Sequence, residues 1–214
     1  MEDVLEVYSR PYDPQKPVIC MDEMHKQCIK EVRKPIPASP GNPERYDSEY
    51  ERNGGVNIFL ASEPLKGRRV VSVTDRRTKV DWAYFIKDLV DNQYPNVDKI
   101  LLIMDNLNTH TRGSLYETFE PQEARRLIDK LEIHHTPKHG SWLNVAEIEL
   151  SVLSRQCLNR RMPDKEIYEQ EIKNWNDDRN NQLIGVEWHF TTKDARTKLK
   201  RLYPKTITKV TNDQ

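Results

Sequence analysis

The apolar residues of this chain gather in short runs, most of them of strand length. Five such runs predict strands, at 18–23, 56–62, 68–74, 98–106 and 132–137. We expect the first strand (VICMDE) to end near Asp22. The second and third are joined by the turn-like sequence EPLKG, which predicts an antiparallel hairpin. The fourth (DKILLIMDN) is almost uninterrupted in its apolar character, as in strands that are buried on both faces.

Other segments place apolar residues at helical spacing. Helices are predicted at 81–94, 121–131, 142–161, 164–181 and 191–202. We expect Asp81 to cap the first helix and Ser141 the third, while Pro121 opens the second in its first turn. The long stretch between the first two strands is rich in proline, which predicts an irregular loop of the kind that often has a function.

The order of these elements predicts the fold class. Three strands in a meander, followed by strands that alternate with helices, are typical of an α/β fold. The sheet is expected to be mixed, a three-strand meander plus parallel strands, with helices on both faces. Right-handed crossovers allow the strand at 98–106 to lie parallel to the first strand. If the two are neighbours, Asp22 and Asp105 meet at one carboxyl edge of the sheet, where such folds place their chemistry.

Composition and charge narrow the class of protein. No apolar run among the 214 residues approaches the ~20 that a membrane-spanning helix needs, and no signal-peptide pattern opens the chain. The three cysteines lack ligand spacing, which is typical of reduced thiols in a cytosolic protein. The net charge is zero, yet residues 191–209 carry seven basic side chains and one acid. Such a segment suits a polyanion such as nucleic acid, but it also fits an ordinary solvated helix face.

Acidic residues follow two of the apolar strands, at Asp22 and Asp105. Either one alone fits an ordinary turn residue, but two carboxylates held close together repel unless a cation or a proton lies between them. A pair of magnesium ions would relieve that repulsion and would stabilise the oxygens of a phosphoryl transfer. The helix at 142–161 offers Glu147 or Glu149 as a third acid. They flank its apolar stripe on opposite sides, so periodicity does not choose between them.

Other kinds of active site find little support. Several histidines invite a zinc interpretation, but no cysteine or second histidine pair completes a ligand set. No Gly-x-Ser-x-Gly elbow, P-loop or dinucleotide motif occurs, which argues against a serine hydrolase and against a small-molecule cofactor.

Three segments together resemble the catalytic core of mariner-related bacterial insertion-sequence transposases, which belong to the DDE superfamily. They are VICMDE, LLIMDNLNTHT at 101–111 and HTPKHGSWLNVAEIELSVLSRQ at 135–156. The resemblance implies a ribonuclease-H-like fold and a DDE-type polynucleotidyl transferase. Such an enzyme cleaves DNA strands and transfers them to a target with two Mg²⁺ or Mn²⁺ ions.

The resemblance also assigns the acids. The catalytic and metal-binding triad falls on Asp22, Asp105 and the acid three positions after Asn144, which is Glu147. The spacing between the second and third acids is longer than is usual in mariner relatives. Residues 1–17 are then expected to be the end of a linker from an N-terminal DNA-binding region that this chain lacks. Residues 18–204 are the catalytic domain and 205–214 a tail.

The implied partners are DNA, both transposon ends and target, and either a second copy of the chain or a full-length transposase. No membrane partner is expected, and the implied location is the bacterial cytoplasm, at the nucleoid. The residues expected to face DNA are basic or precede a helix: Lys138, His139, Ser141, Arg155, Arg160, Arg161, Lys198, Lys200 and Arg201. Candidate auxiliary residues near the acids are Asn106, His110 and Asn144.

Two other functions fit the same residues. One is a metal-dependent nuclease of this fold that hydrolyses nucleic acid without strand transfer. The other is an inactive remnant that binds DNA, or a full-length transposase, and regulates it. Because a fold does not fix a function, a strand-transfer assay is the observation that separates the three. The complete acidic triad favours the active enzymes.

Overall fold

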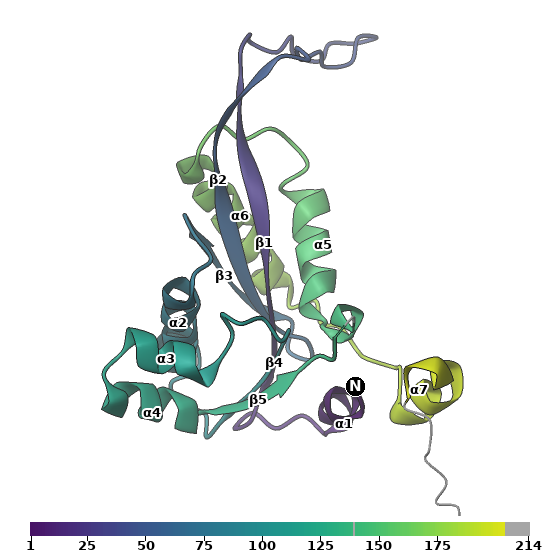
Figure 1. Cartoon of the computed structure of the whole chain (residues 1–214). Coiled ribbons are helices and arrows are strands. Elements are labelled where there is room, and N and C mark those ends of the chain that lie inside the picture. Colours follow the sequence, from purple (N-terminus) through teal and green to yellow (C-terminus); the bar gives the residue numbers. More distant parts are fainter. Residues whose placement is uncertain (139, 204–214) are drawn as a thin grey trace, which may run out of the picture.

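The computed structural model describes residues 1–138 and 140–203, which fold around a mixed five-stranded sheet (Figure 1). Its strands are β1 (Val18–Glu31), β2 (Tyr50–Glu63), β3 (Arg68–Thr74), β4 (Ile100–Met104) and β5 (Leu131–His135). In the order β3-β2-β1-β4-β5, the first three form an antiparallel meander, and β4 and β5 continue from β1 in parallel. The predicted mixed α/β sheet is therefore confirmed.

Helices cover both faces of this sheet. They are α1 (Glu2–Ser9), α2 (Lys79–Asp88), α3 (Arg112–Thr118), α4 (Pro121–Asp129), α5 (Ala146–Gln156), α6 (Lys165–Gln182) and α7 (Thr192–Lys198). A π-helical turn, η1 (Leu89–Gln93), extends α2, and 3₁₀ turns form at η2 (Ser141–Leu143) and η3 (Lys200–Leu202). None of the described helices is long and apolar enough to cross a membrane. Helix α3 was not predicted, because its seven residues are too few to show a period.

Two of the predicted helix caps were wrong. Thr78, not Asp81, is the N-cap of α2. Asp81 is the third helical residue, and its side chain accepts a hydrogen bond from the Thr78 backbone N–H. Ser141 lies in η2 and does not cap α5. Because Asn144 has an extended backbone, the predicted helix at 142–161 divides there and α5 begins only at Ala146.

The sheet separates two apolar cores. Helices α1, α5, α6 and α7 pack on one face, together with Cys20 of β1 and Ile103 of β4. Helices α2, α3 and α4 pack on the other, together with Met21 of β1 and Met104 of β4. Successive strand residues face opposite sides, so both strands are buried on both faces at this level, as the apolar run at 98–106 predicts.

Strand β1 does not end near Asp22 as predicted. Its parallel pairing with β4 stops at Cys20 opposite Ile103, but its antiparallel pairing with β2 continues to Glu31. The extra residues form an arm with β2 that rises above the rest of the sheet in Figure 1. The irregular loop is correspondingly shorter and runs from 32 to 49. The sequence did not predict this extension of β1, because its residues are largely polar. Few other elements pack on the arm, so it does not require apolar side chains.

Residues 2–9, expected to lie in a linker, form α1 and belong to the apolar core. Val4, Leu5 and Val7 are fully buried. The Tyr8 hydroxyl donates to Leu143 O at 2.8 Å and accepts from the Val145 N–H at 3.2 Å. A helix this short is unstable alone, so tertiary packing holds it. In doing so, it braces the segment that leads into α5.

Candidate active site

Asp22 and Asp105 lie on neighbouring strands at the same level of the sheet. Asp105 follows the last residue of β4, and Asp22 lies two residues beyond the last pairing of β1 with β4. If the Cys20–Ile103 register is continued by two residues, Asp22 stands opposite Asp105. Adjacent strands are about 4.8 Å apart. The structure thus brings together the first two acids that the sequence singled out.

Asn144 connects the third element to this pair. Its side-chain amide donates to Met21 O at 2.7 Å, and its carbonyl oxygen accepts from the Ala146 N–H at 3.2 Å. The first contact joins the chain to β1 beside Asp22, and the second satisfies a free N–H at the start of α5. Asn144 therefore fixes the beginning of α5, whose first turn carries Glu147, against β1.

Burial and the neighbouring acids both raise the pKa of Asp22. Burial raises its pKa to about 7, although the Glu23 N–H, which donates to its carboxylate at 2.8 Å, acts in the opposite direction. The negative charges of Asp105, Glu23 and Glu147 raise it further. A carboxyl group surrounded by other carboxylates holds its proton more tightly. The site therefore concentrates negative charge around Asp22.

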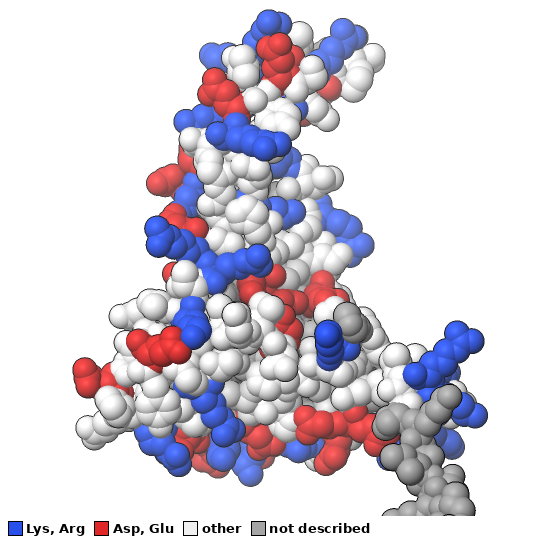
Figure 2. Space-filling view, in the orientation of Figure 1, with Lys and Arg blue, Asp and Glu red and all other residues white. Residues whose placement is uncertain are grey.

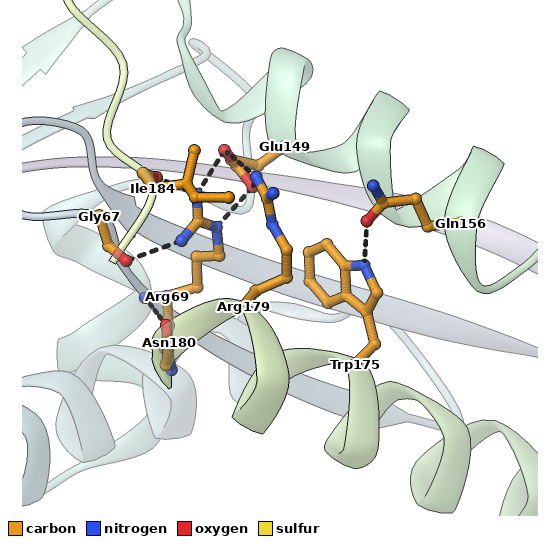
Figure 3. A network of polar contacts seen from close by, with 8 residues as sticks. All are labelled: Gly67, Arg69, Glu149, Gln156, Trp175, Arg179, Asn180 and Ile184. Atoms are coloured by element: carbon orange, nitrogen blue, oxygen red, sulfur yellow. Dashed lines mark hydrogen bonds and ion pairs between the residues drawn. The ribbon is translucent and has the colours of Figure 1, made fainter. Parts of the chain in front are cut away.

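Glu149 lies on another side of α5. Its side chain is only 2% exposed, and its oxygens accept from Arg69 Nε at 2.5 Å and Arg69 Nη2 at 2.8 Å (Figure 3). Arg179 of α6 approaches the same carboxylate at 3.5 Å. Arg69 also donates to the carbonyl oxygens of Gly67 and Ile184. Glu149 thus ties α5 to β3 and α6, which leaves Glu147 as the α5 acid beside Asp22.

His110 occupies a buried position beside Asp105. Its ring is 1% exposed, and Nδ1 lies 2.7 Å from Asp105 Oδ1. Nε2 lies 3.1 Å from Glu23 Oε2, and the ring stacks on Trp82 at a centroid distance of 5.8 Å. Burial alone would lower the pKa of His110, but the two carboxylates outweigh it and raise the pKa to about 9. Of the candidate auxiliary residues, His110 therefore contacts Asp105, and Asn144 contacts the β1 backbone beside Asp22.

The sequence family agrees with this arrangement. A family model for the DDE superfamily endonucleases matches residues 17–167 of the 214. This chain belongs to the DDE superfamily of endonucleases. The predicted assignment to DDE-type polynucleotidyl transferases is confirmed at this level. The matched range includes all three elements that carry the acids.

Solved structures of the Mos1 mariner transposase share the fold of this DDE endonuclease. The Mos1 mariner paired end complex with Mn is 13% identical, covers 85% of this chain and 55% of its own, and has a TM-score of 0.54. The Mos1 Strand Transfer Complex gives 13%, 85% and 53%, with a TM-score of 0.58. These likenesses confirm the ribonuclease-H-like fold. The DDE endonuclease spans little more than half of those chains, and no curated protein sequence matches it.

The residues expected to face DNA lie in three places in this DDE endonuclease. Lys138 and Ser141, together with Asp105 and Asn106, line a cavity of about 440 Å³ beside the acids. His139 lies outside the described residues. Lys200 and Arg201 are exposed on η3, next to α7, whose basic side chains project at the right of Figure 2.

The third place is the last turn of α5 and the segment that links it to α6. Arg155 and Arg160 line a cavity with Glu171, which pairs with Arg160 at 2.5 Å. Arg161 is engaged within the chain, since it pairs with Glu31 at 2.8 Å and packs against the rings of Tyr46 and Tyr50. Lys198, which lies on α7 next to Lys200 and Arg201, is also paired within the chain, with Asp194 at 2.9 Å.

Sequence reasoning missed Glu23 and the two arginine partners of Glu149. Glu23 had a signal, because a residue next to Asp22 in a strand faces the opposite side, and a charge on a buried face calls for a partner. Arg69 and Arg179 had none. They lie 80 and 30 residues from Glu149 in the chain, and only the fold brings them together.

Proposed function

We propose that this chain is the catalytic domain of a DNA transposase that cleaves DNA strands and transfers them to a target. Asp22, Asp105 and Glu147 form its catalytic triad, and two divalent metal ions, Mg²⁺ or Mn²⁺, are its cofactors. The observation that carries the proposal is geometric: Asp105 follows β4 opposite Asp22 of β1, and Asn144 joins the start of α5, which carries Glu147, to β1 beside Asp22. Membership in the DDE superfamily supports it.

The donor set fits magnesium. All three side chains offer carboxylate oxygens, the ligands that this ion prefers. Within residues 1–138 and 140–203, no three His, Cys, Asp or Glu side chains converge tightly enough to hold an ion by themselves. Magnesium is commonly bound through one or two carboxylates, retained waters and substrate phosphates. An open set of acids around Asp22 suits an ion that arrives with the DNA backbone.

The side chains of the proposed site would have different roles. Bound divalent ions supply a more acidic water and stabilise negative charge on the attacked phosphate. Asp22 has a pKa near 7 and must release its proton before it can act as a ligand. Asn144 holds Glu147 toward β1 through its bond to Met21 O. Lys138 and Ser141, on the wall of the adjoining cavity, are placed to contact phosphate oxygens.

The proposed partners follow from the same site. DNA is the substrate, both as transposon end and as target, and the Mos1 structures with this fold are named as paired-end and strand-transfer complexes. The proposed protein partner is a second copy of the chain or a full-length transposase. The proposal takes residues 18–204 as the catalytic domain, with α1 of the preceding segment packed against its core, and it places the DNA in a bacterial nucleoid, as the sequence resemblance implies.

A nicking and strand-transfer assay tests the proposal. The chain is incubated with supercoiled plasmid and with duplexes that carry candidate transposon ends, with Mg²⁺, Mn²⁺ or EDTA. We expect metal-dependent nicking and joined products, both lost in Asp105→Asn at unchanged circular dichroism. Nicking without joining would favour the nuclease, and DNA binding without either would favour the regulatory remnant. Equal cleavage by Asp105→Asn would refute the assigned site.

A further inference from the structure

A buried imidazole lies between two carboxylates that come from different strands. His110 Nδ1 lies 2.7 Å from Asp105 Oδ1, next to the end of β4, and Nε2 lies 3.1 Å from Glu23 Oε2 on β1. The His110 and Glu23 side chains are 1% and 4% exposed. Nε2 and Oε2 are close but off the line that a hydrogen bond requires, so each remains buried without an aligned partner. Burying two ionisable groups, His110 and Glu23, together is costly unless they are paired.

The ring is held in place by its surroundings. Trp82 of α2 stacks on it, and the His110 N–H donates to Leu107 O at 3.0 Å in a turn of the Asp105–Thr111 loop. The loop then passes into α3, where the Ser114 hydroxyl donates to Thr109 O at 2.8 Å. These contacts leave the imidazole little freedom. Its bond therefore restricts the Asp105 carboxylate, which would otherwise rotate at the end of a strand.

Glu23 lies on the opposite side of β1 from Asp22. Successive residues of a strand face opposite sides, and Met21, of the same parity as Glu23, packs in the core of α2, α3 and α4. Glu23 consequently reaches His110 from behind the sheet, while Asp22 faces α5. The His110 contact uses Oδ1 of Asp105, so Oδ2 remains for another ligand.

We propose that His110 is a positioning residue that fixes the carboxylate of Asp105 for metal binding, with Glu23 as the group that anchors the ring. This inference rests on the proposed metal-dependent function. A carboxylate that binds a metal is commonly held by a hydrogen bond through its other oxygen, and loss of such a partner typically lowers metal affinity about 10- to 100-fold.

Two substitutions at position 110 separate positioning from simple burial. Asparagine offers an amide N–H near the place of Nδ1, so His110→Asn keeps a donor for Asp105. Glutamine offers its amide near the place of Nε2, so His110→Gln keeps a donor for Glu23 and loses the one for Asp105. Both variants have a neutral amide side chain, and both lose the aromatic stack on Trp82. Glu23→Gln keeps its shape and removes only the anchoring charge.

The measurement is Mn²⁺ binding to the whole chain, followed by the electron paramagnetic resonance signal of free Mn²⁺. Thermal melting of each variant is recorded in parallel. We expect His110→Gln to weaken Mn²⁺ binding about 10-fold or more and His110→Asn to stay within a few-fold of the parent. Glu23→Gln should have an intermediate effect. The two His110 variants should melt at similar temperatures.

The outcomes distinguish this inference from the function on which it rests. If Asp105→Asn weakens Mn²⁺ binding but the two His110 variants bind it equally well, the metal site holds and the positioning role is wrong. If Asp105→Asn binds Mn²⁺ like the parent, the proposed metal site fails and the role of His110 fails with it. A variant that does not fold is replaced by Glu23→Gln, for which unchanged Mn²⁺ affinity would also contradict the anchoring role.

Discussion

Glu147 and Glu149 lie two residues apart on α5, and replacing each with glutamine should have opposite consequences. Glu149→Gln leaves Arg69 buried without a counter-charge, since both side chains of the pair are 2% exposed. Arg179, also nearly buried, loses the same partner. Glutamine can still accept one hydrogen bond but carries no charge. We therefore expect Glu149→Gln to destabilise the fold.

The magnitude follows from the environment of the pair. Removing one partner of a buried ion pair typically costs about 3–5 kcal/mol of unfolding free energy. Two unit charges 4 Å apart interact by about 4 kcal/mol at an effective dielectric constant of 20. This value lies within the range for the loss of one partner of a buried ion pair. For a chain of this length each 1 kcal/mol lowers the melting temperature by about 2–4 °C. We expect a fall of roughly 10 °C, measured by circular dichroism at pH 7.

Glu147→Gln is the matched control on the same helix. Glu147 is only partly buried and stands beside other acids, so losing its charge should leave melting nearly unchanged while abolishing metal-dependent cleavage. A further variant, Arg69→Met and Arg179→Met with Glu149→Leu, should recover much of the stability, because a buried group of paired charges is often replaceable by packed apolar side chains. This reasoning is refuted if Glu149→Gln has the same melting temperature as the parent, or if Glu147→Gln has a lower melting temperature than the parent.

Three further predictions concern protons and DNA. Asp22 keeps its proton to about pH 7 in the fold but only to about pH 4 when unfolded. Because the folded state then binds more protons, its stability without metal should fall as pH rises between those values. Asp22→Asn should flatten this part of a melting profile, and Mg²⁺ should stabilise the parent more at pH 8 than at pH 5. Charge reversal at Lys198, Lys200 and Arg201 should reduce the salt slope of DNA affinity by up to about 2.7, at about 0.9 per phosphate contact. An unchanged slope would make the segment an ordinary solvated surface. In competition binding at fixed salt, the chain should show little preference for transposon ends over scrambled duplex, because backbone contacts position without specifying sequence. A preference of about 100-fold, or 2.7 kcal/mol, would show that this domain reads sequence by itself.

The sequence predicted the parts of the fold that depend on local pattern. The buried strand β4 is an unbroken apolar run, and the β2–β3 hairpin has two short apolar runs around a turn-like sequence. The full length of β1 was not predictable, because residues 24–31 are largely polar and pair with β2 in an arm. Helix α5 begins later than its pattern suggests, because Asn144 bonds to Met21 across the fold.

The candidate site was predictable to a similar extent. Asp22 and Asp105 could be placed together from strand order alone. Periodicity could not decide between Glu147 and Glu149, since the decision depends on Arg69, a residue of the distant strand β3. The contact of His110 with Asp105 is local, five residues apart, but its contact with Glu23 depends on the pairing of β1 with β4. Contacts between residues far apart in the chain therefore decided the parts of the site that the sequence pattern left open.

The continuity of β1 through Asp22 has a consequence for native-state hydrogen exchange. Backbone amides in the centre of a sheet exchange through openings that cost close to the global unfolding free energy, whereas loop amides exchange through cheaper local openings. Asp22 lies within the β1–β2 ladder, but Asp105 begins a loop and Glu147 lies in the first turn of a helix. We therefore expect the backbone amide of Asp22 to exchange more slowly than the amides of Asp105 and Glu147, the other two acids of the proposed triad.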